Sequence, residues 1–549
     1  MKKTKPLTAA LLCCVTALPL VLSGCPKRTT VTADTLQIAV VRKGYGSDWE
    51  KELARAFTRE TGIDAQVVYD PPSDLFVLNS LEAGPSGNEF DLYCGMPVNV
   101  LFGVVAKGGS YAKGWDKTAF ADLSEVYDAP AVGWKELEEH PDWTNRDIIN
   151  PYITDALTFH VDNKQYGVSF AQGMEGFLYN RTLWDETNER LAAAGNAKLT
   201  LPVTTDEMFT LFNRIGGLPG SARNNAYPLK YAGTVGYVTM GWYHWWAQFD
   251  GSEKCELFLQ GKDKDGIYSP EIFNYDYSER GRRYGYDVMK QLLSSGYAAN
   301  TDQSRDFTTA QVEFLEKKAF FNFNGDWLER ETDSNFARGD VEAGFIRVPI
   351  VSKIIDKCSS AITTDAQLQQ AIDYIDYLDG YNLYGRTAVA ERPSWLTDDD
   401  LKLLTDARHI VISQGMHGIA TAPAYSPHLK EAKEFLKYML SKDGQEIVMN
   451  ACYGNMAPLI TDASQTDYYQ SPEITVMAKT RLEIFPQGTL FGRNAKYPMM
   501  YLANMELMYS FPDGQFPGAT TVKAFMDAEY NTYKPSWAGM MAAAGVSNA

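Results

Sequence analysis

Hydrophobic positions alternate between two periods in the stretch that follows residue 35. Continuous apolar runs of strand length are separated by segments in which apolar residues recur every three or four positions, the spacing of one helix face. These apolar runs are residues 36–41, 63–69 and 90–94. Ser47 and Glu50 have the spacing of a capping box at the start of the first helix, and Gly62 follows its end. The order of strands and helices predicts a doubly wound α/β lobe, in which ligands bind beyond the carboxyl ends of the strands.

The same alternation continues through the middle of the chain. Further strands are predicted at 165–170, 177–180, 319–323 and 344–350. Helices are predicted to begin where a capping residue or a proline precedes apolar residues at helical spacing. These starts are Thr204, Ser278, Thr308 and Pro427. Residues 352–410 have a strongly helical pattern with acidic stretches, and a second α/β lobe is therefore expected.

Aromatic residues gather at predicted turns, and one run places them at adjacent positions. In Trp242-Tyr243-His244-Trp245-Trp246 the rings are not spaced for one helix face, so we expect some of them to meet solvent, another lobe or a ligand. Flat rings stack on the apolar faces of sugars, whose hydroxyl groups need fixed polar partners. For any single aromatic residue a core position is the alternative, whereas Trp327, beside the polar turn at 324–326, favours a ligand contact.

The N-terminus has the pattern of an export signal. Lys2, Lys3 and Lys5 precede an apolar run that is short for a membrane-spanning helix. Leu22-Ser23-Gly24-Cys25 then resembles a bacterial lipobox, in which the cysteine thiol receives a lipid. An uncleaved anchor and an ordinary signal with an accidental cysteine are the alternatives. The lipobox predicts a protein that works outside the cytoplasm, tethered to a membrane.

Composition narrows the classes of function. The formal charge is −18, and without the three lysines of the signal it becomes −21, so the basic face that a nucleic-acid binder needs is not expected. The sequence has no HExxH, GxxxxGK[ST], GxGxxG or GxSxG motif, so we expect neither a metal nor a cofactor.

Four cysteines beyond the signal, far apart in sequence, are either free thiols or partly paired. They are Cys94, Cys255, Cys358 and Cys452.

Six segments carry recurring motifs in a fixed order along the chain. They are Trp49–Ile63, Phe90–Tyr93, Tyr166–Trp184, Lys317–Trp327, Glu431–Gln445 and Gly454–Pro458. Behind a lipobox, this order resembles the extracellular solute-binding proteins of the carbohydrate class, the receptors of ABC importers, which are related to maltose-binding protein. The chain differs from typical members in its greater length at 352–410 and after 470, and in Ser169, where relatives often have proline.

The resemblance implies an α/β periplasmic-binding-protein (type II) fold with two discontinuous lobes and a hinge that closes them on a ligand. By matching segments, residues 1–24 are a lipoprotein signal peptide and residues 25–34 a tether. The N-terminal lobe is then expected at 35–166 plus 348–417, and the C-terminal lobe at 167–347 plus 418–549.

The resemblance also implies that the ligand lies between the lobes and that no bond is broken, so no catalytic residue is expected. It carries Trp327 over as a sugar-stacking residue, and it places the loop 94–97 and the turn around Asp48 along the cleft. The candidate ligand-binding residues are Tyr45, Asp48, Tyr69, Asp70, Met96, Gln172, Glu175, Tyr237, Trp242, Trp245, Asp326, Trp327 and Arg347, and Cys25 is the candidate lipidation site.

These features favour a lipid-anchored receptor outside the cytoplasm that captures a carbohydrate, most simply an oligosaccharide, and delivers it to an ABC transporter permease. We expect a monomer whose partners are the sugar, the permease subunits and, through the lipid on Cys25, the membrane. A peptide or a polyamine is the alternative ligand. A surface glycan-degrading enzyme and an adhesion module are the alternative functions.

Overall fold

The computed structural model describes most of the chain between residues 32 and 543. The described residues are 32–41, 44–69, 79–81, 83–96, 119–156, 163–170, 173–234, 237, 239–278, 280–336, 340–387, 389–414, 419–454, 466–484, 489–491 and 521–543. The signal, the tether up to residue 31 and most of the helix expected at 73–84 lie outside these ranges. Within them, no helix is long and apolar enough to cross a membrane.

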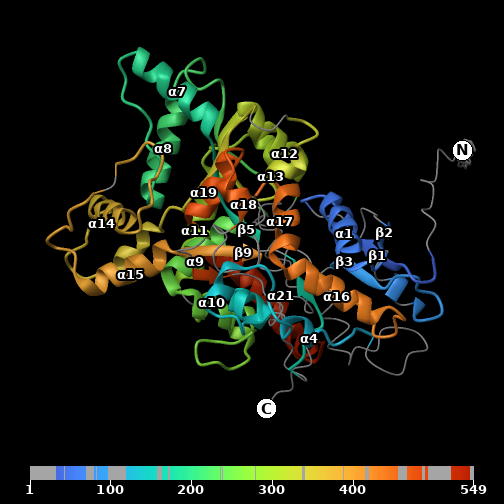
Figure 1. Cartoon of the computed structure of the whole chain (residues 1–549). Coiled ribbons are helices and arrows are strands. Elements are labelled where there is room, and N and C mark those ends of the chain that lie inside the picture. Colours follow the sequence, from blue (N-terminus) through green and yellow to red (C-terminus); the bar gives the residue numbers. More distant parts are fainter. Residues whose placement is uncertain are drawn as a thin grey trace, which may run out of the picture.

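One sheet belongs mainly to the start of the chain, and we call the body around it the first lobe (Figure 1). Its strands are β1 (Leu36–Val40), β2 (Ala65–Tyr69), β3 (Leu92–Met96), β4 (Val168–Ser169) and β10 (Ile419–Thr421). They lie in the order β2-β1-β3-β10-β4. β1 pairs with β2 and β3 in parallel, as the strand–helix alternation predicts, whereas β10 runs antiparallel to both β3 and β4.

Helices from both ends of the chain cover this sheet. α1 buries Trp49, Leu53 and Phe57, and the ring of Phe57 packs edge-on against Phe435 with 5.3 Å between the centroids. The helices of this lobe are α1 (Asp48–Thr61), α4 (Ser124–Tyr127), η1 (Lys135–Glu138), α5 (Asn145–Ile148), α6 (Pro151–Ala156), α16 (Leu429–Leu440) and α17 (Lys442–Ala451). The segment 419–451 is therefore part of the first lobe.

The ends of α1 were predicted, but not the way in which it is capped. Gly62 has a φ of 75°, and its N–H donates to the Thr58 carbonyl, which closes the helix as expected. Ser47 occupies the position before the helix but makes no side-chain cap hydrogen bond. Glu50 is buried. The predicted capping box is therefore wrong, although the helix starts where it indicated.

The second sheet is the centre of a larger body, which we call the second lobe. Its strands are β5 (Gly173–Asn180), β6 (Tyr227–Lys230), β7 (Ala319–Gly325), β8 (Ala343–Ile346), β9 (Ile410–Gln414) and β11 (Thr489–Phe491). The order is β11-β9-β5-β7-β6, with β8 also paired to β5. β5 is antiparallel to β7, β8 and β9 and is buried along its length, so it is the axis of this sheet.

Helices of the second lobe come from three parts of the chain. They are α7 (Arg181–Ala193), α8 (Thr205–Gly217), α9 (Thr239–Asp250), α10 (Ser252–Leu259), η3 (Pro270–Phe273), α11 (Arg280–Ser294), η4 (Asn300–Ser304), α12 (Phe307–Glu313), η5 (Phe314–Lys318), α13 (Leu328–Thr332), η6 (Ser352–Lys357), α14 (Asp365–Leu378), α15 (Asp398–Arg408), α19 (Val476–Ile484) and α21 (Val522–Ala543). The short helix α18 (Asp467–Gln470) precedes α19. Thr204 caps α8 as predicted, whereas Asp306 rather than the neighbourhood of Thr308 caps α12.

The aromatic run at 242–246 forms part of α9, and its rings are all inside the second lobe. Trp242 stacks on Tyr286 of α11 with 4.7 Å between the centroids, and the Trp245 ring packs edge-on against Phe323 of β7. Trp246 and Tyr243 are buried as well. The expectation that part of this run meets solvent or a ligand is wrong, because α9 is surrounded by other elements and is apolar around its whole circumference.

Strand pairing assigns residues 348–414 and 419–451 to lobes opposite to those expected, whereas α19, β11 and α21 lie in the second lobe as expected. β9 pairs with β5, and Ile354, Leu368 and Leu404 belong to the hydrophobic core of the second lobe, so 348–414 lies there. β10 pairs with β3 and β4, and the apolar residues of α16 and α17 complete the first core. The chain therefore crosses between the lobes three times: from β4 to β5, from β9 to β10, and back to the second lobe between α17 and α19.

A buried ion cluster joins the helical segment α14–α15 to the second lobe, at the end that lies far from the first lobe (Figure 1). Asp376 accepts hydrogen bonds from the Arg408 guanidinium at 2.8 and 3.0 Å and from Arg347 at 3.1 Å. Arg347 also pairs with Asp379 at 2.5 Å, and the Asp379 carboxylate contacts His409 at 2.7 Å. Arg386 adds a second ionic link, since it pairs with Asp373 of α14 and Glu207 of α8.

The four cysteines beyond the signal are free thiols, with Cys94, Cys255 and Cys452 buried and Cys358 half-buried. This decides between the two possibilities that their spacing in the sequence allows.

We predict that Asp376→Ala destabilises the second lobe by about 3–5 kcal/mol, because it leaves two buried guanidinium groups without their shared carboxylate. Urea unfolding followed by circular dichroism measures the loss. Asp406→Ala is the control, since Asp406 forms an exposed pair with Lys402 and its removal is expected to change stability by less than about 0.5 kcal/mol. Equal stabilities for the two variants would contradict the assignment.

Candidate functional site

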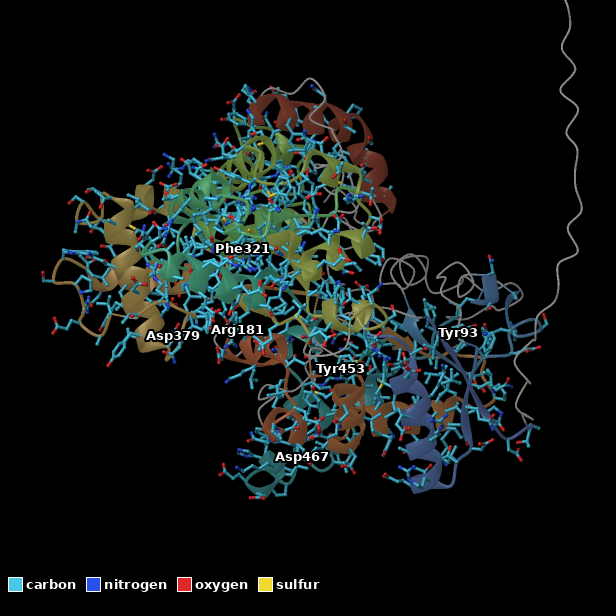
Figure 2. All side chains as sticks on the ribbon, turned by 90° about the horizontal axis from the view of Figure 1, so that it is seen from above. Tyr93, Arg181, Phe321, Asp379, Tyr453 and Asp467 are labelled. Atoms are coloured by element: carbon cyan, nitrogen blue, oxygen red, sulfur yellow. The ribbon has the colours of Figure 1, made fainter. Side chains whose placement is uncertain are left out.

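Loops that follow strands of the two lobes meet in a cluster of residues, which we call the lobe contact. The first lobe contributes residues 44–48 and Tyr453, and the second contributes 326–333. In Figure 2, Tyr93 marks the first lobe and Phe321 the second, and Tyr453 lies between them. Residues 44–48 follow β1, and residues 326–333 follow β7, so both sides of the contact are loops at strand ends, where α/β lobes bind ligands.

Asp326 provides the buried carboxylate of the lobe contact. Its carboxylate is fully buried and accepts from the Met174 backbone N–H at 2.8 Å and from the Arg481 Nε at 2.8 Å. The Tyr45 hydroxyl of the first lobe donates to its other oxygen. Burial, with the neighbouring Asp326 carboxylate, raises the pKa of Tyr45, so this phenol stays protonated as the donor. Asp326 therefore shapes the site and is not itself exposed to a ligand.

Arg330 of α13 links the lobes through several hydrogen bonds. Its Nε donates to the Tyr45 carbonyl at 3.2 Å, and its Nη2 donates to Asp48 at 2.7 Å. Its Nη1 donates to the Tyr453 hydroxyl at 3.2 Å and pairs with Asp333. Asp48 is 72 % exposed, so solvent screens that ion pair, whereas the bonds to Tyr45 and Tyr453 are better shielded.

Trp327 lies between the lobes rather than deep in one of them. It is only 3 % exposed and packs with the hydrophobic cluster of the first lobe, although the chain around it belongs to the second. Tyr45 and Tyr237 meet its ring edge-on at 6.5 and 5.9 Å between centroids. A side chain at Gly44 would come within 2.9 Å of the Trp327 Cβ, so the glycine permits this approach. The ring becomes accessible only when the lobes part.

A group of polar side chains of the second lobe stands beside this ring. Glu331 accepts from the Gln311 amide at 2.6 Å, and its other oxygen lies against Gly44, where an added Cβ would be 2.7 Å away. Burial raises the pKa of Glu331 from its usual 4.5 to about 7. Burial also raises the pKa of Tyr237, and the carboxylates of Glu331 and Glu175 raise it further.

The structure brings together six of the sequence-predicted site residues, directly or through one neighbour. These are Tyr45, Asp48, Glu175, Tyr237, Asp326 and Trp327. Tyr69 and Met96 end β2 and β3, and their side chains are outside the described part of the structure, as are Asp70, Gln172, Trp115 and Cys25. Trp49, at the start of α1, is buried in the first core against Phe170.

Three predicted ligand residues lie elsewhere in the second lobe and are corrected here. The Trp242 indole donates to the Arg282 carbonyl at 3.3 Å, and that of Trp245 donates to the Pro349 carbonyl at 3.1 Å, so both are satisfied inside the core. Arg347 belongs to the ion cluster of α14 and α15. Burial against distant segments, which linear spacing does not reveal, places them away from the lobe contact.

Sequence reasoning missed Arg330, Glu331, Gln311, Tyr453 and Arg481. Arg330 and Glu331 had a local signal, because they follow Trp327 within one turn of helix. Arg481 and Tyr453 meet Asp326 and Arg330 across more than a hundred residues of sequence and had none. Aromatic rings beside carboxyl and amide groups, divided between two lobes, are suited to enclosing a ligand.

The comparisons with known proteins agree with this arrangement. The family model described as bacterial extracellular solute-binding protein matches residues 52–476, more than half of the chain. A comparison with curated protein sequences gives no match.

Solved structures of two-lobe binding proteins resemble the whole chain. The GacH receptor of Streptomyces glaucescens, studied unliganded and with acarbose, is 14% identical with a TM-score of 0.53, covering 91% of this chain and 97% of its own. RafE in complex with raffinose is 16% identical with a TM-score of 0.53, and the match covers 91% of this chain and 99% of RafE. A chitin oligosaccharide binding protein is 15% identical with a TM-score of 0.53, and the match covers 92% of this chain and 100% of that protein. At these identities the likeness shows the fold, and the predicted type II fold is confirmed.

We predict that Arg330→Ala opens the lobes when no ligand is present. The variant loses the bonds to Tyr45, Asp48 and Tyr453. Closure of the lobes therefore becomes less favourable by about 1–3 kcal/mol. Small-angle X-ray scattering should give a larger radius of gyration than for the parent protein. Arg55→Ala, which removes an exposed arginine paired with Glu52 of the same helix, is the control and should leave scattering unchanged. A variant with the parent's radius would show that Arg330 does not hold the contact.

We predict that Glu331 makes the closed arrangement less stable as pH rises. An acid with a raised pKa in the native state binds a proton more readily there than in the unfolded chain. Its contribution to the stability of the folded protein is therefore complete below pH 4.5. This contribution is lost as the pH rises from 4.5 to about 7. The loss is at most about 3 kcal/mol. Melting temperatures are measured from pH 4 to 8. The melting temperature of Glu331→Gln should rise relative to that of the parent protein as the pH increases across this window.

The control for this measurement is Glu52→Gln, an exposed carboxyl on α1. Its melting curve should run parallel to that of the parent protein at every pH. A parallel curve for Glu331→Gln as well would mean that Glu331 titrates as an exposed acid.

Proposed function

The chain belongs to the family of bacterial extracellular solute-binding proteins, and we propose that its two lobes capture a carbohydrate between them for delivery to an ABC transporter permease. Its family consists of binding proteins and not of enzymes. The observation that carries the proposal is the Trp327 ring, held between the lobes and flanked by Tyr45 and Tyr237. Rings in such a position stack on the apolar faces of sugars.

Polar groups at the lobe contact supply what a sugar's hydroxyl groups need. Gln311 is fully buried, and its amide N–H₂ donates to Glu331 and Asn324. Its Oε1 has no hydrogen-bond partner among the described residues. A buried acceptor without a donor is unfavourable, and a ligand hydroxyl would satisfy it. The carboxyl group of Glu331, beside it, is a second acceptor.

The structural neighbours support the same class of ligand. The complexes among them contain acarbose and raffinose, and the third neighbour is named for chitin oligosaccharides. We propose an oligosaccharide rather than a single sugar, since the neighbours' ligands have several rings. Peptides and polyamines are the alternatives that the experiment below distinguishes.

Binding requires the lobes to move. Trp327 is almost wholly covered when they touch, so the ligand enters an open form. The lobes then close over it by rotation about the three places where the chain crosses between them. A ligand shifts this equilibrium only by as much as it binds the closed form more tightly, and contacts with both lobes provide that difference.

We further propose that the receptor is lipid-anchored. The sequence Leu22-Ser23-Gly24-Cys25 and the polar residues 26–34 would attach the folded lobes to the outer face of the cell membrane through Cys25. A tether of that length keeps the receptor close to a permease in the same membrane, which raises the effective concentration of the two partners.

We predict that an oligosaccharide raises the melting temperature and that Trp327→Ala weakens its binding by about 2 kcal/mol, or roughly 30-fold in Kd. A thermal-shift panel of oligosaccharides, peptides and polyamines identifies the ligand, and calorimetry measures Kd. Trp143→Ala is the control, because Trp143 stacks on His140 within a small separate cluster of the first lobe.

The proposal fails if a peptide or a polyamine, and no sugar, shifts the melting temperature. It also fails if Trp327→Ala and Trp143→Ala bind the sugar with equal affinity, because the ring would then not touch the ligand.

A further inference from the structure

A small cavity opens in the second lobe within the segment 246–282, among α9, α10 and α11. It has a volume of about 30 Å³ and is lined by Trp246 of α9, Phe258 of α10, the turn at 262–264 and Arg282 of α11, among others. All of these residues belong to the core or rim of the second lobe, and none of them takes part in the lobe contact. The cavity is therefore separate from the carbohydrate site.

Two buried side chains in its wall carry hydrogen-bond donors without acceptors. Trp246 is 2 % exposed and Arg282 is 1 % exposed. Within the described part of the chain, the indole Nε1 of the first and the Nε and Nη1 of the second have no hydrogen-bond partner. A buried donor left in this state is unfavourable, so an acceptor in the cavity is favoured.

Aromatic packing holds both donors beside the same wall. The Arg282 guanidinium lies 4.9 Å from the centre of the Phe258 ring, and Trp246 meets that ring edge-on at 5.0 Å. On its other side Arg282 pairs with Glu529 of α21 through Nη2 at 2.5 Å. Glu529 therefore occupies one nitrogen of the guanidinium and leaves the remaining two for the cavity.

The charges around the cavity favour an anion as the acceptor. Four cationic side chains line it, namely Arg282, Lys254, Lys262 and Lys264, and Asp263 is the carboxylate in the lining. Glu529 and Asp265 pair with Arg282 and Lys264 from outside the lining. Asp263 is already satisfied, since it accepts from two backbone N–H groups at 3.0 Å and from the Tyr277 hydroxyl at 2.9 Å. The pKa of Asp263 is lowered, chiefly by the backbone N–H of Ile267 and the Tyr277 hydroxyl acting against burial, so it stays ionised and offers no proton to a ligand.

We propose that this cavity is a binding site for one small monovalent anion of the size of chloride, held by the Arg282 guanidinium and the Trp246 indole N–H. The volume accommodates about two water-sized particles, which is too little for a sugar or a nucleotide. Through Arg282 and Glu529 the anion would help to fix α21, the C-terminal helix, against α11. Neither the ligand of the lobe contact nor the lipid anchor enters this argument.

The direct test is a crystal of the full chain grown or soaked in sodium bromide. Anomalous scattering should place a bromide ion in the cavity, within hydrogen-bonding distance of Arg282 and Trp246. The proposal is overturned if the cavity contains only water under these conditions.

The test in solution is the dependence of the melting temperature on chloride at constant ionic strength, with gluconate as the replacing anion. A saturable site should raise the melting temperature by about 2–4 °C per tenfold increase in chloride above Kd. Sulfate, which is too large for the cavity, should not reproduce the effect.

Trp246→Phe removes one donor but keeps a ring in place, so it should reduce the chloride effect. Trp245→Phe is the matched control on the same helix, because it loses an N–H that donates to the Pro349 carbonyl. It should lower stability without changing the chloride dependence. A bromide peak with no chloride dependence, or with equal dependence in both variants, would mean binding at crystal concentration only and would overturn the proposal.

Discussion

The buried carboxylate of Asp326 is the point on which the rest of the site depends. It accepts from a backbone N–H of β5, from Arg481 of α19 and from Tyr45 of the first lobe, so one side chain joins the central strand, a late helix and the opposite lobe. A carboxylate removed from water needs such a set of donors, because its desolvation is otherwise prohibitive. This requirement fixes the backbone of residues 326–331, and with it the positions of Trp327, Arg330 and Glu331.

The same constraint explains how the contact can hold two lobes together and still release them. Most of the donors to Asp326 lie in its own lobe, and only the Tyr45 hydroxyl comes from the other. Parting the lobes therefore exposes one phenol and leaves the ion pair with Arg481 intact. Arg330 contacts the first lobe mainly through a carbonyl, a hydroxyl and an exposed carboxylate, each of which water can replace at small cost.

Local patterns in the sequence were sufficient for the elements and for the type of fold. The strands at β1, β2 and β7, the end of α1 at Gly62 and the cap of α8 at Thr204 all depend on neighbours within a few residues. Tyr45 and Asp48 were candidates because ligands of α/β lobes meet the ends of strands. Asp326 and Trp327 were candidates because a ring beside a polar turn suits a sugar, and the family resemblance also indicated Trp327. Arg330 and Glu331 could have been predicted as well, because they lie within one helical turn of Trp327.

What failed depends on contacts that sequence order does not encode. β9 and β10 are separated by a few residues but add to different sheets, and the choice rests on which sheet edge each strand completes. The aromatic run of α9 suggested exposure because adjacent rings cannot share one face, yet a helix enclosed on every side has no exposed face. Arg481 reaches Asp326 across 155 residues, a distance at which no periodicity persists.

The free thiols of the fold have a consequence for where the chain is able to mature. Burial raises the pKa of both Cys94 and Cys452, so neither forms the thiolate that reacts with oxidants or with other thiols. Folding then needs no disulfide exchange, and once folded the lobes keep these two thiols unreactive. The lobes should reach the same structure on either side of the membrane, in a reducing cytosol as readily as in an oxidising envelope.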